Sequence, residues 1–212
     1  ETLGHNAHRF SIEWSRSEPE EGRWDEKEVE HYRRVVESIR NHGMTPFATL
    51  HHFTDPLWFD ARGGWTAPDA PDFIARYAGY MAKALGDAVP FWLTINEPSV
   101  VPGAGFLVGE FPPQKRDMAL GMKVARNIII ALGEMHHAVK ENAPHDPAVG
   151  PVINMTFVET ASDSEADRRA AHLFDSYANG VWFDAFRDGV IAPPVGGGEH
   201  RAGDPVDVHE HD

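Results

Sequence analysis

The chain of 212 residues has a formal net charge of −14, 42% hydrophobic residues and no cysteine. The acidic balance argues against nucleic acids and membranes as partners, and the lack of cysteine excludes disulfides, thiolate catalysis and a cysteine-ligated zinc site. No apolar run approaches the roughly 20 residues that cross a bilayer. Because no signal peptide is visible, we expect a cytoplasmic location.

Strand-like and helical patterns alternate along the first half of the chain. Asp25 and Glu28 have the spacing of a capping box at the start of one helix, and Gly43 follows its end. Pro46 restricts strand pairing near the start of the next apolar run. The predicted elements are a strand over residues 8–14, a helix over 25–41, a strand over 44–52 and a helix over 71–85.

The alternation continues in the second half. Ser164, with Asp167 three residues later, is typical of a helix N-terminus. Periodicity is lost after Pro193, so we expect a domain over residues 1–194 and a polar loop or tail over 195–212. The predicted elements are a strand over residues 90–95, a helix over 116–142, a strand over 148–155, a helix over 164–178 and an apolar helical segment over 181–186.

Strands that alternate with helices indicate βαβ units and a parallel sheet. An open nucleotide-binding sheet would carry a glycine-rich turn after its first strand, and none follows Trp14. Polar and aromatic residues gather instead at the C-terminal strand ends, where (β/α)8 barrels build their sites. We therefore predict an α/β fold, a partial (β/α)8 TIM barrel of about four βα units that this chain alone does not close. The strand-end residues are Glu13, Trp14, Arg16, His51, His52, Phe53, Asn96, Glu97 and Asn154.

Glu97 stands beside Asn96 at the end of the third predicted strand. A protonated carboxyl group there can give its proton to a departing glycosidic oxygen, while an amide binds a sugar hydroxyl. His52 could bind another hydroxyl, and Arg9 could hold a carboxylate. A structural acid remains the alternative on these residues alone. Trp14, Phe53 and Trp92 would suit sugar faces or the core equally well.

Five ordered segments are specific when taken together, and the similarity that they carry covers about residues 5–194. In their order and spacing they resemble glycoside hydrolase family 1, the β-glucosidase and β-galactosidase family, over its second to fifth strands. The segments are Arg9-Phe-Ser-Ile-Glu-Trp-Ser-Arg16, Thr49-Leu-His-His-Phe53, Gly63-Gly-Trp65, Thr94-Ile-Asn-Glu-Pro98, and Pro151-Val-Ile-Asn154 with the Ser162-Asp-Ser-Glu-Ala-Asp167 that follows it.

The resemblance implies a retaining β-glycosidase that acts on small β-glycosides or oligosaccharides, without a cofactor or metal. Glu97 would be the general acid/base, and Asn96 would bind the 2-hydroxyl of the sugar. His52 would contact a neighbouring hydroxyl. Arg9 would position the nucleophilic carboxylate, and Asn154 would lie near Glu97.

The chain departs from the family in two respects. Phe53 replaces the tryptophan that the family usually carries after His52. The Thr-Glu-Asn-Gly segment that supplies the nucleophile is nowhere in the sequence, nor are the first-strand Gln and the last-strand Glu and Trp that bind sugar. A retaining mechanism needs two carboxyl groups roughly 5–5.5 Å apart, and no spacing identifies a substitute. We therefore expect the 212-residue chain alone to be inactive.

Three hypotheses stay open. The chain is an internal fragment of a β-glycosidase, a truncated product that binds sugar without hydrolysing it, or a half-barrel that associates with itself or another chain through unpaired sheet edges. Other residues have plainer interpretations. The pair His136 and His137 lacks a metal-binding pattern and indicates packing, His209 and His211 belong to the polar tail, Arg16 is expected in an ion pair, and His51 in the barrel wall.

Overall fold

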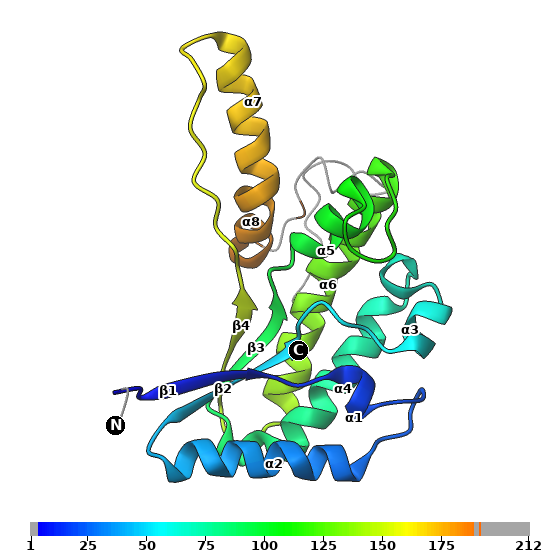
Figure 1. Cartoon of the computed structure of the whole chain (residues 1–212), viewed down its shortest axis with the longest axis vertical. Helices are drawn as coiled ribbons and strands as arrows, with labels where there is room; N and C mark the ends of the chain where they lie inside the picture. Colours follow the sequence, from blue (N-terminus) through cyan, green and yellow to red (C-terminus); the bar gives the residue numbers. More distant parts are fainter. Residues whose placement is uncertain (1–3, 189–190, 192–212) are drawn as a thin grey trace. The chain divides into compact units, whose positions relative to one another are not determined.

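The computed structural model describes residues 4–188 and 191. The chain divides into two compact units, whose strands and α-helices are labelled in Figure 1. Within the described residues, the first unit comprises residues 4–96 and 131–152, and the second comprises residues 97–130, 153–188 and 191.

A parallel sheet forms the centre of the first unit. Its strands lie in chain order, β1 (Ala7–Ser11), β2 (Thr45–His51), β3 (Phe91–Asn96) and β4 (Ala148–Val152). Ser11 lies opposite Thr49 in the register. Parallel neighbours joined through helices are βαβ units, so the predicted partial (β/α) sheet is confirmed. Within the described residues the sheet is not closed.

The helices of this unit bury one face each. Helix α2 (Glu26–Asn41) buries Val29, Tyr32, Val36 and Ile39, and α4 (Ala70–Leu85) buries Ile74, Tyr77, Met81 and Leu85. These positions repeat with the period of an α-helix, which is why apolar packing stabilises them as helices. The remaining elements are α1 (Trp14–Ser17), α3 (Leu57–Ala61), the 3₁₀ turns η1 (Gly64–Thr66) and η2 (Gly86–Ala88), and the later part of α6 (Met118–Asn142).

The N-terminus of α2 differs from the predicted capping box. The Asp25 carboxylate accepts a hydrogen bond from the Lys27 N–H at 2.9 Å, as an N-cap does. The Asp25 N–H donates to the Ser17 carbonyl, so it is not available to Glu28. Glu28 instead pairs with Arg16 at 2.6 Å. The predicted contact of the Glu28 side chain with the Asp25 N–H is therefore wrong. The ion pair expected for Arg16 is confirmed.

Two strands end earlier than predicted. Strand β1 stops at Ser11 because Glu13 caps a one-turn helix, α1, by accepting from the Ser15 N–H. Trp14 begins that helix and is buried rather than placed at the rim. Strand β4 ends at Val152 and not at residue 155.

The second unit is helical. Ser164 caps α7 (Glu165–Asp175) by accepting from the Asp167 N–H, as the sequence predicts. The π-helix η4 (Ser176–Gly180) and α8 (Val181–Asp188) follow. The earlier elements are α5 (Val100–Pro102), the π-helix η3 (Gly103–Val108) and the first part of α6. In the part of the chain that the structure describes, no helix is long and apolar enough to span a membrane. The predicted tail over 195–212, with its histidines, lies outside the described residues.

Candidate active site

Arg9 on β1 links three strands of the sheet. Its Nε donates a hydrogen bond to the Thr49 hydroxyl on β2 at 2.9 Å, and its Nη2 donates to Oδ1 of Asn96 at the end of β3. Thr49 and Asn96 are both buried. Because the guanidinium is a planar fork of donors, it fixes the orientation of the Asn96 amide, whose NH2 group then points away from Arg9.

Ser11 lies two residues beyond Arg9, so it is on the same face of β1. Its hydroxyl forms a 2.8 Å hydrogen bond with Nδ1 of His52, which follows the last residue of β2. This contact anchors the imidazole of His52 to β1 through Nδ1. The next residue, Phe53, has a left-handed backbone with φ of +72°.

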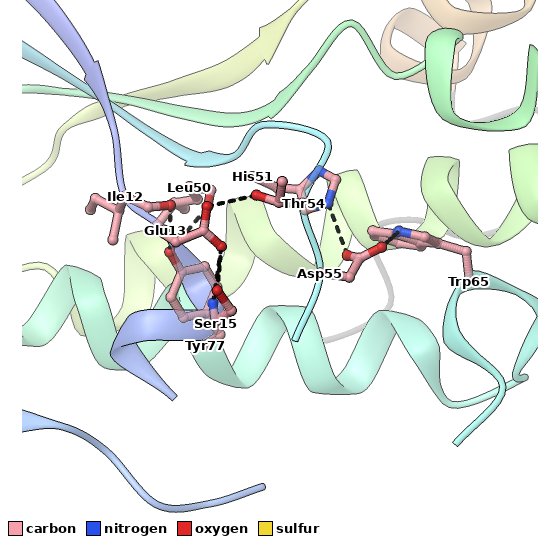
Figure 2. A network of polar contacts seen from close by, with 9 residues as sticks. All are labelled: Ile12, Glu13, Ser15, Leu50, His51, Thr54, Asp55, Trp65 and Tyr77. Atoms are coloured by element: carbon pink, nitrogen blue, oxygen red, sulfur yellow. Dashed lines mark hydrogen bonds and ion pairs between the residues drawn. The ribbon is translucent and has the colours of Figure 1, made fainter. Parts of the chain in front are cut away.

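Glu13 connects the ends of the first two strands (Figure 2). Its Oε2 accepts from the Thr54 hydroxyl at 2.7 Å, and its Oε1 accepts from the hydroxyl of Ser15 at 2.7 Å. Its N–H donates to the Tyr32 hydroxyl at 2.8 Å, and burial raises the pKa of that phenol. Glu13 is thus held by its backbone and by both carboxylate oxygens.

His51 and His52 make different contacts although they are adjacent. The His51 side chain is buried, and its Nε2 meets Oδ1 of Asp55 at 3.0 Å. The other oxygen of Asp55 accepts from the indole N–H of Trp65 at 3.1 Å (Figure 2). His51 therefore supports the structure around the β2 exit, in keeping with its expected wall position.

Glu97 and Asn154 belong to the second unit. Glu97 directly follows β3, is half-buried, and has a left-handed φ of +46°. Its carbonyl accepts from the Val100 N–H at 2.9 Å, which starts the turn into α5. Non-glycine residues in this conformation cluster at functional sites. Asn154 is exposed, two residues after β4.

The structure brings Arg9 and Asn96 into direct contact and places His52 on Ser11. Neither Thr49 nor Ser11 stood out in the sequence as a site residue. The alternation along β1 places Ser11 on the same face as Arg9, but the register that sets Thr49 opposite Ser11 comes from the structure.

The tryptophans considered as sugar platforms are core residues. Trp14 and Trp92 are 1% and 0% exposed, so neither presents a ring face to a ligand. Trp14 stacks on Tyr77 with ring centroids 5.2 Å apart. Phe53 is half-buried and makes an edge contact with His52. Of the three aromatic candidates, Phe53 is therefore the one that lies beside a candidate site residue.

The chain is similar to known glycosidases over most of its length. The family model described as Glycosyl hydrolase family 1 matches residues 1–192. Beta-glucosidase A of Thermotoga maritima is 35% identical over 181 residues, which are 84% of this chain and 40% of that protein. The chain thus spans about 40% of the length of such curated relatives.

Solved structures match over a similar extent. The family 1 β-glucosidase from Thermotoga maritima has a TM-score of 0.85 at 31% identity, covering 89% of this chain and 43% of that one. It has also been solved with deoxynojirimycin and with glucoimidazole. The β-glycosidase from Pyrococcus horikoshii has a TM-score of 0.80 at 38% identity, covering 88% and 43%. The chain belongs to glycosyl hydrolase family 1.

Proposed function

We propose that the protein containing this chain hydrolyses small β-glucosides with retention of configuration, and that Glu97 is its general acid/base. The observation that carries the proposal is the hydrogen bond from Arg9 to Asn96, which orients a buried amide directly before Glu97. The names of the relatives support a β-glucoside as substrate.

The residues have separable roles in a double displacement. A carboxylate nucleophile outside the motifs found here attacks the anomeric carbon while Glu97 gives its proton to the leaving oxygen. Glu97 then takes a proton from water, and the hydroxide that forms releases the sugar. The Asn96 amide donates to the 2-hydroxyl, and Nε2 of His52 meets a neighbouring hydroxyl. Arg9 holds Asn96 through a hydrogen bond, and we assign to its charge the orientation of the nucleophilic carboxylate.

The role of Glu97 can be tested with leaving groups of different basicity, using the protein at its natural length. In Glu97→Gln, hydrolysis of a disaccharide should fall by about 10²–10⁴-fold, because its leaving group needs a proton. Formation of the glycosyl-enzyme from a dinitrophenyl glucoside should change little, since that leaving group departs as an anion. Glu110→Gln is the matched control, because Glu110 is exposed.

A second variant tests the base role. In Glu97→Ala, azide ion should accelerate turnover of the dinitrophenyl glucoside and give a β-glucosyl azide, because azide attacks without losing a proton. Full activity of Glu97→Gln on a disaccharide would refute the assignment. If the protein with Glu97 intact bound deoxynojirimycin but released no sugar, it would be a sugar-binding protein and not a hydrolase.

A further inference from the structure

The four residues that follow β2 are fastened to the rest of the first unit by four side-chain hydrogen bonds. His52 bonds to Ser11, Thr54 to Glu13, and Asp55 to both His51 and Trp65. We call residues 52–55 the β2 exit loop. The chemistry proposed above uses His52 from this loop and none of the groups that hold the loop.

The fastening surrounds a strained residue. Phe53 has a φ of +72°, a conformation that is unfavourable for any residue with a Cβ and persists only where the surrounding structure holds it. Both of its neighbours in the chain, His52 and Thr54, are tied to residues at the C-terminal end of β1 or just beyond it. If the tie to Thr54 were lost, the backbone at Phe53 could relax, and the imidazole of His52 would change direction.

Glu13 does more than a helix cap requires. A cap needs one acceptor, and Oε1 supplies it to the Ser15 N–H and hydroxyl. The second oxygen, Oε2, accepts from Thr54, which is 41 residues away in sequence. Hydrogen bonds to a carboxylate are about twice as strong as bonds between neutral groups, so this contact is a suitable fixing point for an exposed loop.

We propose that Glu13 is a positioning residue that, through Thr54, holds the β2 exit loop so that Ser11 can direct Nε2 of His52 toward the sugar. The proposal rests on the proposed function, because it treats His52 as a sugar contact. The role of Glu13 is separate from its role as a cap, since each carboxylate oxygen serves one of them.

The two oxygens can be tested one at a time in the protein at its natural length. Thr54→Val keeps the shape of the side chain and removes the donor to Oε2. Thr54→Ser restores a hydroxyl. Ser15→Ala removes the hydroxyl that donates to Oε1 and serves as the matched control. The readouts are the ¹⁵N resonances of the His52 ring, assigned with His52→Gln, and the Kd for deoxynojirimycin.

Thr54→Val should shift the His52 ring resonances and raise the Kd about tenfold, roughly the effect of one charge-assisted hydrogen bond. Thr54→Ser should return both toward wild type, and Ser15→Ala should leave both unchanged. The proposal is overturned if Thr54→Val leaves the ring resonances in place or if Thr54→Ser fails to restore them. It is also overturned if Ser15→Ala has the same effect as Thr54→Val, because the contact between Glu13 and Thr54 would then have no separate role.

The ring resonances also separate this proposal from the proposed function. They report on how His52 is held whether or not the protein cleaves a glycoside. Shifted resonances in Thr54→Val together with full disaccharide hydrolysis by Glu97→Gln would refute the acid/base assignment and keep the positioning role. Unshifted resonances in Thr54→Val, together with loss of disaccharide hydrolysis in Glu97→Gln, would refute the positioning role and keep the acid/base assignment.

Discussion

The guanidinium of Arg9 donates a hydrogen bond to the side-chain carbonyl of Asn96, 87 positions further along the chain. The same guanidinium donates to Thr49, so one side chain fixes three strands. Lysine has a single point charge and cannot make both bonds with this geometry.

Arg9→Lys should therefore lower kcat/KM for a β-glucoside by about 10–100-fold, because a hydrogen bond from a charged group contributes about 1.5–3 kcal/mol. Steady-state kinetics on the protein at its natural length measures the change. Arg40→Lys is the control, since Arg40 is an exposed residue of α2. An unchanged kcat/KM in Arg9→Lys would show that the Asn96 amide does not need this partner.

Glu18 is a buried acid that stabilises the first unit. Its side chain is 0% exposed and accepts from the Trp14 indole, the Gly22 N–H and Arg76. In Glu18→Gln, an amide NH2 group would face these donors, so we expect a loss of about 1–3 kcal/mol in the free energy of unfolding. Urea denaturation measures it, with the exposed Glu20→Gln as control.

The effect of Glu18 depends on pH in a defined direction. Burial raises the pKa of Glu18 above its ordinary value of 4.5, against the opposing hydrogen bonds from Trp14 and Gly22. The folded protein therefore holds this proton when the unfolded chain has lost it, and stability falls as pH rises from 4.5 to the folded pKa. The difference in the free energy of unfolding between the wild type and Glu18→Gln should be largest below pH 4.5 and should decrease as pH rises to the folded pKa. A gap that widens with rising pH would contradict the raised pKa.

Tyr177 carries a hydroxyl that is buried without a hydrogen-bond partner among the described residues. Removing it in Tyr177→Phe should leave stability at neutral pH unchanged or higher by about 1 kcal/mol, because an unsatisfied buried hydroxyl is unfavourable. Tyr80→Phe is the contrast, since the Tyr80 hydroxyl donates to Glu26 at 2.7 Å and its loss should destabilise. A larger loss in Tyr177→Phe than in Tyr80→Phe would show that the Tyr177 hydroxyl is satisfied.

Because of Tyr177, we also expect the stability of the fold to decrease in alkaline solution. Burial raises the pKa of Tyr177 from its ordinary 10.0 to about 12. The unfolded chain loses the proton first, so stability should fall as pH rises from about 10 to about 12. Phenolate absorbance and urea midpoints across this range measure the effect, and part of the slope should disappear in Tyr177→Phe. An identical slope in that variant would assign the transition to other groups.

Gly86 follows α4 where another part of the chain approaches closely. A Cβ there would lie 2.8 Å from Cδ of Pro144 and 3.3 Å from the Ala143 Cα. Gly86→Ala should therefore cost about 1–3 kcal/mol, because the backbone has to shift. Gly150→Ala is the matched control, with nothing within 4 Å of its added Cβ. Equal urea midpoints for the two variants would contradict the predicted clash.

The sequence predicted the elements whose apolar residues repeat with a clear period. Helices α2 and α4 and strands β2 and β3 lie within a residue or two of their predicted bounds, since burial of one face determines both the pattern and the structure. The N-cap at Ser164 was also readable, because a cap is a local interaction.

What the sequence did not reveal depends on long-range partners. The Asp25 N–H, for example, donates to the Ser17 carbonyl outside helix α2, so the predicted capping box does not form. The end of the first predicted strand is an exception, because Glu13 caps α1 through the nearby Ser15. The contact between Glu13 and Thr54 spans 41 residues, and no local pattern encodes it. The candidate residues Arg9, Asn96 and His52 were proposed from the predicted strands and given specific roles by the family resemblance, whereas their hydrogen-bond partners required the structure.

The left-handed backbone of Phe53 limits how the turn after β2 can change in evolution or in the laboratory. Val, Ile and Thr are branched at Cβ and are poorly tolerated at positive φ, so substitutions to them at position 53 should be lost through poor folding before any change in sugar preference can be selected. Gly, Asn and Asp adopt this backbone more readily. A directed-evolution library at position 53 that includes these residues and the aromatic ones, and omits the β-branched ones, would sample the sequences that the turn permits.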